Sequence, residues 1–289
     1  MGPRMLDGEA LAASILDDLC RRVEALVKGG HRPGLGTILT GDDPPSVRYV
    51  EMKHEDCAKV GIASFGEHLA PTTTQAELEA TISRFNDEKE IDAFLVQLPL
   101  PNGLDEDAAL LAVDPDKDAD GLHPVNLGRL VIGTEGPLPC TPAGIVELLS
   151  AYDVPVEGRH VVIVGRGLTI GRPLSLLLSA KRPKCNAAVT ILHTGVERDT
   201  FVSLVRQADV IVAAAGRPSI ITADMVRPGA AVVSAGATFE GRKLLPDADP
   251  GVAEVAGFLT PRIGGVGPMT RAMLLRNAVA AAERRYGAA

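Results

Sequence analysis

Short apolar segments alternate with amphipathic helical segments along most of the chain, and this alternation restricts the fold more than any other feature. The apolar segments have the length of buried strands, and apolar residues recur at helical spacing in the segments between them. Strands joined by helices in this way form βαβ units with parallel strands, so the sequence predicts an α/β protein. The expected strands are 35–39, 62–69, 93–98, 160–164, 189–192, 210–213 and 230–234, and the expected helices are 7–28, 45–60, 75–86, 141–152, 171–180, 200–207 and 268–285.

Two groups of these units, separated by a proline-rich stretch, predict two domains. The length of 289 residues suits roughly two domains of about 150 residues each. Residues 99–142 contain too many prolines for one uninterrupted helix. Thr141 and Pro142 have the residue types of an N-cap and a first-turn proline, so the next helix is expected to begin there. We place the domain boundary near residue 150.

The composition excludes several classes of protein. A net charge of −8, no Trp and three Tyr argue against a nucleic-acid binder, which needs a basic track with stacking rings. The first residues lack the apolar run of a signal peptide, and apolar runs elsewhere are too short to span a bilayer. We therefore expect a cytoplasmic protein without a membrane or nucleic-acid partner. Cys20, Cys57, Cys140 and Cys185 lack metal-binding spacing, so reduced thiols and no metal site are expected.

A glycine-rich loop joins the expected strand 160–164 to an apolar helix. It reads Gly165-Arg166-Gly167-Leu168-Thr169-Ile170-Gly171. Glycines in this position let the backbone approach a pyrophosphate at a helix N-terminus, although a tight strand-to-helix turn also favours glycine. The next strand ends in His193 and Thr194, without the acidic residue that usually holds an NAD ribose, and Arg166 lies inside the loop. These features favour NADP over NAD.

Tyr49 and Lys53 are four residues apart in the expected helix 45–60, so they share one face of it. The same Tyr-x-x-x-Lys spacing occurs in short-chain dehydrogenases, but there it follows the nucleotide-binding loop. Here it precedes that loop, which disfavours that family. Two interpretations remain for the pair: a solvated helix face with a partly buried ring, or two groups that point into a cleft.

Three further segments have residues suited to ligands. Residues 116–121 match the opening of a calcium-binding loop, but the twelfth position is Leu127 and prolines obstruct the flanking helices, so calcium is excluded. That turn is either a surface loop or a site for a ligand with donor groups, such as an aminopyrimidine. Gln97 lies at the carboxyl end of the expected strand 93–98, where open α/β sheets bind ligands. The glycines of 264–270 serve either a turn or the approach of a ligand.

Six segments that carry these features occur in order along the chain: 46–53, 96–101, 116–121, 139–142, 164–173 and 264–270. Together they resemble the bifunctional methylenetetrahydrofolate dehydrogenase/methenyltetrahydrofolate cyclohydrolase family. The resemblance implies two α/β domains with the active-site cleft between them. Residues 1–148 would form the folate-binding catalytic domain, with helix 268–289 packed back on it, and 149–267 an NADP-binding Rossmann domain with a parallel sheet. It also implies a homodimer.

By the same resemblance, the protein oxidises 5,10-methylenetetrahydrofolate with NADP and hydrolyses the methenyl product to 10-formyltetrahydrofolate. Tyr49 would stack on the pterin, Asp120 would bind its amide and amino groups, and Lys53, oriented by Gln97, would act as acid and base in the hydrolysis. Arg166 and Thr194 would meet the 2′-phosphate. The other implied substrate-binding residues are Leu98, Pro99, Gly264, Gly265, Pro268 and Thr270. The implied cofactor-binding residues are Gly165, Arg166, Gly167, Thr169, Ile170, Gly171, His193, Thr194 and Ala237.

The sequence departs from the family pattern mainly in the expected cofactor domain. Where the family has Ile-Asp-Val-Gly-Ile, this chain has Val233-Ser234-Ala235-Gly236-Ala237, which removes an acceptor and side-chain area beside the cofactor. Arg262 and Ile263 replace Val-Pro before two glycines, which adds a cation near the folate site. Two alternatives to the bifunctional enzyme follow. One is an enzyme with a single activity or an altered cofactor preference, and the other is a catalytically silent folate-binding partner.

Overall fold

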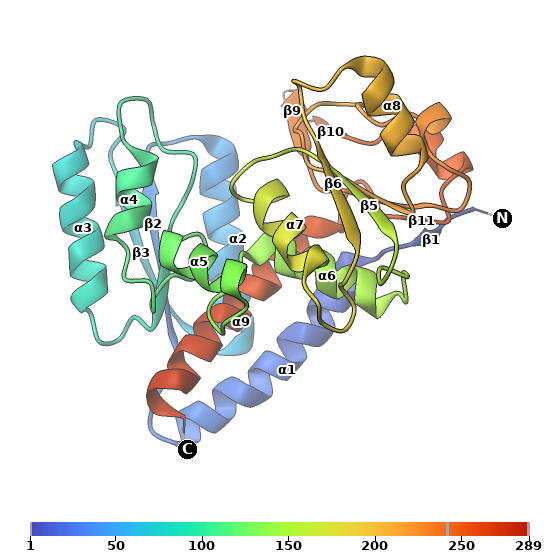
Figure 1. Ribbon diagram of the computed structural model, residues 1–289. Helices are drawn as coiled ribbons and strands as arrows, with labels where there is room; N and C mark the ends of the chain where they lie inside the picture. Colours follow the sequence, from blue (N-terminus) through green and yellow to red (C-terminus); the bar gives the residue numbers. More distant parts are fainter. Residues whose placement is uncertain (1, 241–242, 288–289) are drawn as a thin grey trace. The chain divides into compact units, whose positions relative to one another are not determined.

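The computed structural model describes residues 2–240 and 243–287, and the chain divides into two compact units with separate parallel sheets. One unit comprises Ala13–Leu138 and the chain from Arg271 on, and the other comprises the residues up to Ala12 together with Pro139–Thr270. Two helices, α1 (Gly8–Lys28) and α9 (Val266–Tyr286), belong partly to each unit (Figure 1). The predicted two-domain α/β fold is confirmed.

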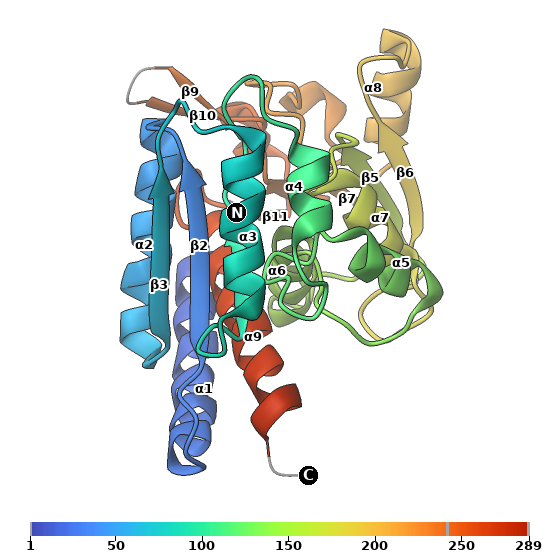
Figure 2. The ribbon, with the colours of Figure 1, turned by 90° about the vertical axis from the view of Figure 1, so that its left-hand side faces the viewer.

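The unit that contains Ala13–Leu138 has a three-stranded parallel sheet in the order β3-β2-β4. β2 lies in the centre, and α2 and α3 cover opposite faces of the sheet (Figure 2). The proline-rich stretch contains two short helices, α4 and α5. The elements are β2 (Gly34–Thr40), α2 (Pro44–Val60), β3 (Ala63–Leu69), α3 (Gln75–Asp87), β4 (Ala93–Val96), α4 (Glu106–Ala112) and α5 (Pro124–Ile132).

The core of this unit lies between α3 and the sheet. Ile82 and Phe85 of α3 pack with Ile38 and Phe94 of the strands, and all four are at most 2% exposed. Gly36 lies beneath this contact, because a Cβ there would come within 2.8 Å of the Phe85 ring and of the Phe94 Cβ. The close approach of α3 to the sheet therefore requires glycine at this position.

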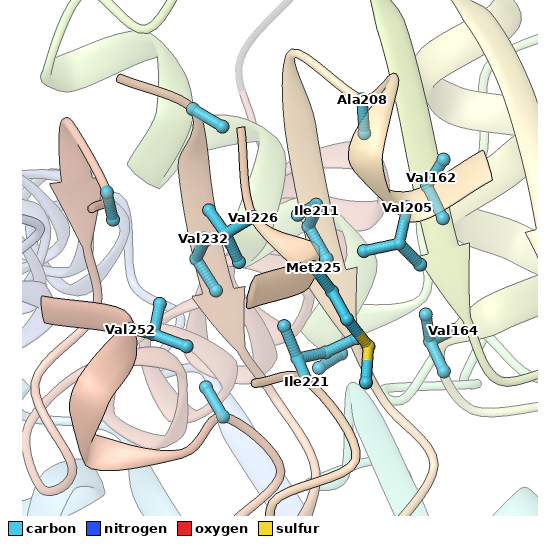
Figure 3. Close-up of a cluster of buried hydrophobic side chains, with 14 of the residues drawn as sticks. Val162, Val164, Val205, Ala208, Ile211, Ile221, Met225, Val226, Val232 and Val252 are labelled. Atoms are coloured by element: carbon cyan, nitrogen blue, oxygen red, sulfur yellow. The ribbon is translucent and has the colours of Figure 1, made fainter. Parts of the chain in front are cut away.

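The other unit has six parallel strands in the order β1-β11-β8-β7-β5-β6. Buried aliphatic side chains from β5, β7 and β8 form its core with Met225 (Figure 3). A separate antiparallel pair, β9 and β10, precedes the last strand of the sheet. The elements are β1 (Arg4–Met5), α6 (Cys140–Ala151), β5 (His160–Val164), α7 (Gly171–Ser179), β6 (Ala188–Leu192), α8 (Arg198–Arg206), β7 (Val210–Ala213), η1 (Ala223–Met225), β8 (Ala231–Ser234), β9 (Ala237–Glu240), β10 (Lys243–Pro246), η2 (Pro250–Glu254) and β11 (Phe258–Leu259).

The division into units differs from the predicted boundary near residue 150. β1 pairs with β11, and Tyr152 at the end of α6 donates its hydroxyl to the carbonyl of Asp7 at 3.0 Å. These contacts connect the first residues of the chain and α6 to the six-stranded sheet. Because α6 is one continuous helix from Cys140 to Ala151, a boundary at residue 148 would cut through it.

The prediction that Thr141 caps this helix is wrong. α6 begins at Cys140 after Pro139, and no side chain caps its N-terminus. Thr141 therefore lies within the first turn, where its Oγ1 shares a hydrogen bond of 3.0 Å with Thr270 Oγ1. The prediction from Thr141 located the start of the helix to within a residue or two, but it assigned the wrong role to the Thr141 side chain.

Replacing Lys117 with Met should destabilise the three-stranded unit. Lys117 is 7% exposed, and its Nζ donates to the carbonyls of Phe85 and Glu88 at the end of α3, at 3.0 and 2.7 Å. Burial lowers the pKa of this ammonium. Loss of these bonds should lower the free energy of unfolding by about 1–3 kcal/mol, measured by urea denaturation. Lys89→Met, at an exposed position nearby, is the control. Equal effects of the two variants would contradict the assigned role of Lys117.

Candidate active site and cofactor site

The helix α2 presents Tyr49 and Lys53 one turn apart. Asp43 caps the start of the helix by accepting the N–H of Ser46 at 3.0 Å. The Lys53 ammonium lies 5.0 Å from the centre of the Tyr49 ring, and only 4% of Lys53 is exposed. An ammonium near a ring face is stabilised by the negative potential of that face. The partly exposed ring and the buried ammonium therefore lie next to each other.

Gln97 links this helix to the sheet. It follows β4 directly, and its backbone N–H donates to the carbonyl of Ile38 at 2.8 Å. Its side-chain Oε1 accepts from Lys53 Nζ at 3.0 Å, and its Nε2 donates to the carbonyl of Leu98 at 2.6 Å. The second bond determines which end of the amide faces the lysine. Tyr49, Lys53 and Gln97 are thus brought together, as predicted, beside the cis Leu98–Pro99 peptide.

Other titratable groups of α2 are unsuited to nucleophilic chemistry. His54 hydrogen-bonds to the hydroxyls of Thr37 and Ser64 on the sheet. Burial, and then the charge of Lys53, lower the pKa of His54. Burial raises the pKa of Cys57 to about 12, so its thiol stays protonated at neutral pH and is a poor nucleophile. Lys53 remains the group on this helix with both a buried ammonium and a hydrogen-bonded orienting partner.

The acidic turn 116–121 contains carboxylates with different functions. Asp118 is buried and accepts the N–H groups of Gly121 and His123 at 2.9 and 2.8 Å. Its Oδ2 also accepts from Asn126 Nδ2 at 2.9 Å. Both oxygens of Asp118 therefore hold the turn and the start of α5 in shape. Asp118 therefore has a structural function, and the binding of folate by Asp120 stays a prediction.

Asp120 lies towards the same end of the sheet as Gln97. The residues before it run parallel to β4, because Phe94 donates its N–H to the carbonyl of Lys117 and accepts the N–H of Ala119, at 2.8 and 3.0 Å. A chain that advances in parallel with β4 reaches the carboxyl end of the sheet together with it. Asp120 is partly buried there.

The last helix supports the acidic turn and α2. Asn277 donates through Nδ2 to the carbonyls of Ala119 and Leu138, both at 2.9 Å. Arg271 donates to Asp56 of α2 at 2.6 Å. Burial acts to raise the pKa of Asp56, but the hydrogen bond from Arg271 helps to hold it below its usual value. The helix therefore restrains the backbone next to Asp120 as well as the helix that carries Lys53.

The other predicted folate-binding residues, Gly264, Gly265, Pro268 and Thr270, belong to the unit with the six-stranded sheet. Gly264 has a φ of 82°, and its carbonyl accepts the N–H of Glu9 at 2.9 Å. A Cβ on Gly8 would lie 1.7 Å from the carbonyl oxygen of Gly265. These contacts give the glycine loop a packing function against the start of α1, and its binding of folate stays a prediction.

The predicted phosphate loop has two glycines that its packing requires. Gly165 has a φ of 132°, and a Cβ on it would lie 2.2 Å from the carbonyl oxygen of Ala214. A Cβ on Gly171 would lie 2.1 Å from the carbonyl oxygen of Gly165. A Cβ on Gly167 would meet nothing within 4 Å. The loop leads into α7, whose N-terminus has no side-chain cap at Ile170, so its first N–H groups can attract an anion.

A cavity of about 660 Å³ lies at the carboxyl ends of β5, β6 and β7. The strand β5 lies between β6 and β7, so the connections from β5 and β6 run in opposite directions across the sheet. Ligands of open α/β proteins bind at such a switch point. The predicted cofactor residues that line the cavity are Gly165, Arg166, Gly167, His193 and Thr194.

Four other predicted cofactor residues have different positions. Thr169, Ile170 and Gly171 are not among the described residues that line the cavity. They form the turn before α7 and its first residue. Ala237 begins β9, and its side chain lies outside the described part of the structure.

The sequence analysis missed a second wall of this cavity. Ala214, Ala215 and the segment 217–220, which follow β7, line it. Arg198 also lines it, with its guanidinium 5.5 Å from the centre of the Phe201 ring. This wall could have been predicted, because the segment begins at the carboxyl end of an expected parallel strand, where open α/β sheets bind ligands.

Two hydrogen-bond donors face each other at the cavity. Arg166 Nη1 lies 3.4 Å from His193 Nε2, and the N–H of Gly195 donates to His193 Nδ1 at 3.1 Å. With Nδ1 accepting, a neutral imidazole has its hydrogen on Nε2. The guanidinium has only donors, so an acceptor placed between the two groups would satisfy both. A phosphate oxygen has the chemistry that this pair requires.

Ser234, which stands where the family has an aspartate, is bonded to the backbone of neighbouring segments. Its Oγ accepts the N–H of Ala248 at 3.3 Å, and its N–H donates to Thr260 Oγ1 at 2.9 Å. The loss of the family's carboxylate acceptor beside the cofactor stays a prediction. Arg262 donates to the carbonyl of Leu244 on β10 at 3.3 Å.

The described residues offer no metal cluster, disulfide or membrane-spanning helix. In the described ranges 2–240 and 243–287, no three His, Cys, Asp or Glu side chains are grouped so that they could hold a metal ion. The four cysteines are free thiols. None of the described helices combines the length and the apolar character needed to cross a membrane.

Comparison with known proteins decides the family. Residues 6–120 match the catalytic domain of tetrahydrofolate dehydrogenase/cyclohydrolases, and residues 139–286 match their NAD(P)-binding domain. The chain belongs to the tetrahydrofolate dehydrogenase/cyclohydrolase family. The bifunctional protein FolD of Syntrophotalea carbinolica is 55% identical to it over 285 residues, which cover 99% of this chain and 98% of that protein.

Solved structures of family members have the same fold. The bifunctional FolD dehydrogenase/cyclohydrolase of Campylobacter jejuni is 40% identical, with a TM-score of 0.92 over 97% of this chain and 99% of that chain. The Trypanosoma brucei FolD, solved with NADP and an inhibitor, is 36% identical, with a TM-score of 0.94 over 100% of both chains. The predicted family is confirmed.

Replacing Asn277 with Leu should weaken binding of the tetrahydrofolate substrate. The substitution removes the two bonds that hold the carbonyls of Ala119 and Leu138, so the backbone next to Asp120 should loosen. A loss of roughly 1 kcal/mol would raise KM about fivefold, measured in the dehydrogenase assay. Arg284→Gln, at an exposed position on the same helix, is the control. An unchanged KM in a folded Asn277 variant would rule out this supporting role.

Proposed function

We propose that this protein oxidises 5,10-methylenetetrahydrofolate to 5,10-methenyltetrahydrofolate with NADP and hydrolyses the product to 10-formyltetrahydrofolate. The observation that carries the proposal is the buried Lys53, hydrogen-bonded to Gln97 beside Tyr49, in a chain of the dehydrogenase/cyclohydrolase family. The family assignment supports both activities, in preference to a single activity or a silent binding partner.

In the oxidation, the folate side of the protein has mainly to align the substrate. The bound nicotinamide supplies the acceptor for the hydride, and no base is needed because the hydride leaves with its electron pair. Tyr49 would offer a flat surface for the pterin. Asp120 would accept hydrogen bonds from the pterin amide and amino groups, which a carboxylate strengthens by its charge. Leu98 and Pro99 would border the same site.

In the hydrolysis, protons must move, and Lys53 is the group placed to move them. Water adds to the methenyl carbon and loses one proton. The carbon–nitrogen bond at N5 then breaks, N5 takes up a proton, and the remaining O–H loses its proton as the formyl C=O forms, so one proton is released overall. Lys53 would take and return these protons. Gln97 keeps the ammonium in place through its Oε1, while Leu98 fixes the amide from the other side. The protonated thiol of Cys57 takes no part.

The facing donors of Arg166 and His193 support NADP as the cofactor. A 2′-phosphate between them would accept from the guanidinium and from the imidazole Nε2–H. Thr194 lines the same part of the cavity and adds a hydroxyl. NAD-binding sites usually hold the ribose hydroxyl with an acidic residue at the end of this strand. Here the first acidic residue after Thr194 is Glu197. Gly165, Gly167 and the start of α7 would hold the pyrophosphate.

Three further properties belong to this proposal. The enzyme would act in the cytoplasm, where its 10-formyl product supplies one-carbon units for purine biosynthesis and other formyl transfers. It would form a homodimer. The outer edge of β3 is compatible with that assembly, because β3 pairs only with β2 among the described strands and leaves its other edge open.

Both activities should be measurable in one purified sample. Cofactor reduction with 5,10-methylenetetrahydrofolate should be at least tenfold more efficient with NADP than with NAD, since a charged hydrogen bond to the phosphate contributes about 1.5–3 kcal/mol. Loss of methenyltetrahydrofolate should occur without any cofactor. Hydrolysis without reduction would indicate a single activity, and equal turnover of the two cofactors would overturn the phosphate assignment. The absence of activity in both assays would support the alternative of a catalytically silent folate-binding partner.

Lys53→Met should abolish hydrolysis of methenyltetrahydrofolate while the protein still binds folate. The thioether keeps much of the packing but cannot carry a proton, and general acid–base catalysis typically contributes about 10²–10⁴-fold. Hydrolysis rates and folate affinity should be measured separately. Lys59→Met is the matched control, because Lys59 lies on the same helix with 62% of its side chain exposed. A Lys53 variant with unchanged hydrolysis would remove Lys53 from the mechanism.

A further inference from the structure

Asp247 is a buried carboxylate behind the cofactor cavity, and the proposed mechanism does not use it. It has no solvent exposure, and it follows the last residue of β10. Its Oδ2 accepts the N–H groups of Ala215 and Gly216 at 2.7 and 3.1 Å, and its Oδ1 accepts the N–H of Arg217 at 2.8 Å. One side chain therefore binds three consecutive backbone N–H groups.

The three N–H groups belong to the cavity wall that follows β7. Ala215 and Arg217 line the cavity, and Gly216 between them has a φ of 60°. A turn that directs successive N–H groups to one point needs an acceptor there, because backbone N–H groups buried without a partner are costly. Asp247 supplies that acceptor and is not among the described residues that line the cavity. The shape of this wall thus depends on a residue that does not itself line the cavity.

The surroundings of Asp247 leave no room for another arrangement. A Cβ on Gly236 would lie 2.1 Å from Asp247 Oδ2, so only glycine fits beside the carboxylate. Thr238 Oγ1 donates to the carbonyl of Gly216 at 2.8 Å. The N–H and the carbonyl of Gly216 are thus both bonded to side chains. The carbonyl before this turn, that of Ala214, packs against Gly165 of the phosphate loop. The turn is therefore confined between the carboxylate and the phosphate loop.

The ionised form of Asp247 matches these partners. Burial raises the pKa of its carboxyl, and the three backbone hydrogen bonds act in the opposite direction. The three backbone partners are all donors, so a protonated oxygen would place a hydrogen against an N–H group. A carboxylate is the side chain that accepts at both ends without offering a donor.

We propose that Asp247 is a positioning residue for the cofactor: it sets the conformation of the turn 215–217, and through it the cofactor affinity of the dehydrogenase reaction. The inference rests on the proposed binding of NADP in this cavity. Because hydrolysis of methenyltetrahydrofolate needs no cofactor, Asp247 should influence one of the two activities and leave the other unchanged.

The test is Asp247→Asn, which keeps the shape of the side chain but replaces one acceptor oxygen with an NH₂ donor. We expect the KM and the Kd of NADP to rise about tenfold, the equivalent of about 1.4 kcal/mol, while cyclohydrolase kcat/KM stays within twofold of the wild type. Asp249→Asn is the matched control. Asp249 is also a backbone acceptor, but it binds the N–H of Gly251 and not the cavity wall.

A second variant reaches the same contact from the other side. Gly236→Ala should displace the carboxylate without removing its charge, and it should raise the KM of NADP in the same direction. Loss of cyclohydrolase activity would show that the Asp247→Asn variant does not fold. In that case the Gly236→Ala variant tests the inference alone. Wild-type affinity for NADP in either folded variant would overturn the inference. An absence of saturable NADP binding in the wild type would instead overturn the proposed cofactor site.

Discussion

Backbone N–H groups at the ends of parallel strands need acceptors outside the sheet, and buried aspartates supply them in this protein. Asp247 accepts three such groups behind the cofactor cavity, Asp118 accepts two in the acidic turn, and Asp92 accepts the N–H of Gly34 at the start of β2. A carboxylate is expensive to bury unless donors surround it. Asp247 and Asp92 therefore connect segments that are far apart in the chain, whereas Asp118 stabilises the turn to which it belongs.

The candidate sites follow from the same geometry. In a parallel sheet the loops at the carboxyl ends of neighbouring strands meet, so the glycine loop after β5, the residues after β6 and the turn after β7 line one cavity. In the other unit, Gln97 follows β4 and receives Lys53 from α2. The chemistry of each site then follows from its groups. Glycines and donors suit a phosphate, whereas a buried ammonium with an orienting amide suits proton transfer.

The sequence predicted long elements well and short ones poorly. The bounds of β5 and β7 agree with the prediction, since buried parallel strands appear as continuous apolar runs. β1 and β11 have two residues each and no periodicity to detect, and α4 and α5 lie among prolines. In the sites, the helical spacing of Tyr49 and Lys53 was visible locally. The turn after β7 was missed, because its acceptor, Asp247, follows a strand that comes much later in the chain.

The sequence by itself determined the alternation of strands and helices, the glycine loop, and the face of α2 that carries Tyr49 and Lys53. These features depend on spacings of a few residues, which backbone geometry converts directly into structure. Only the tertiary structure decided that Asp118 holds the acidic turn and that Asp247 supports the cavity wall. These pairings depend on which loops the sheet order brings together, and that order arises from burial of the whole core, which no local spacing encodes.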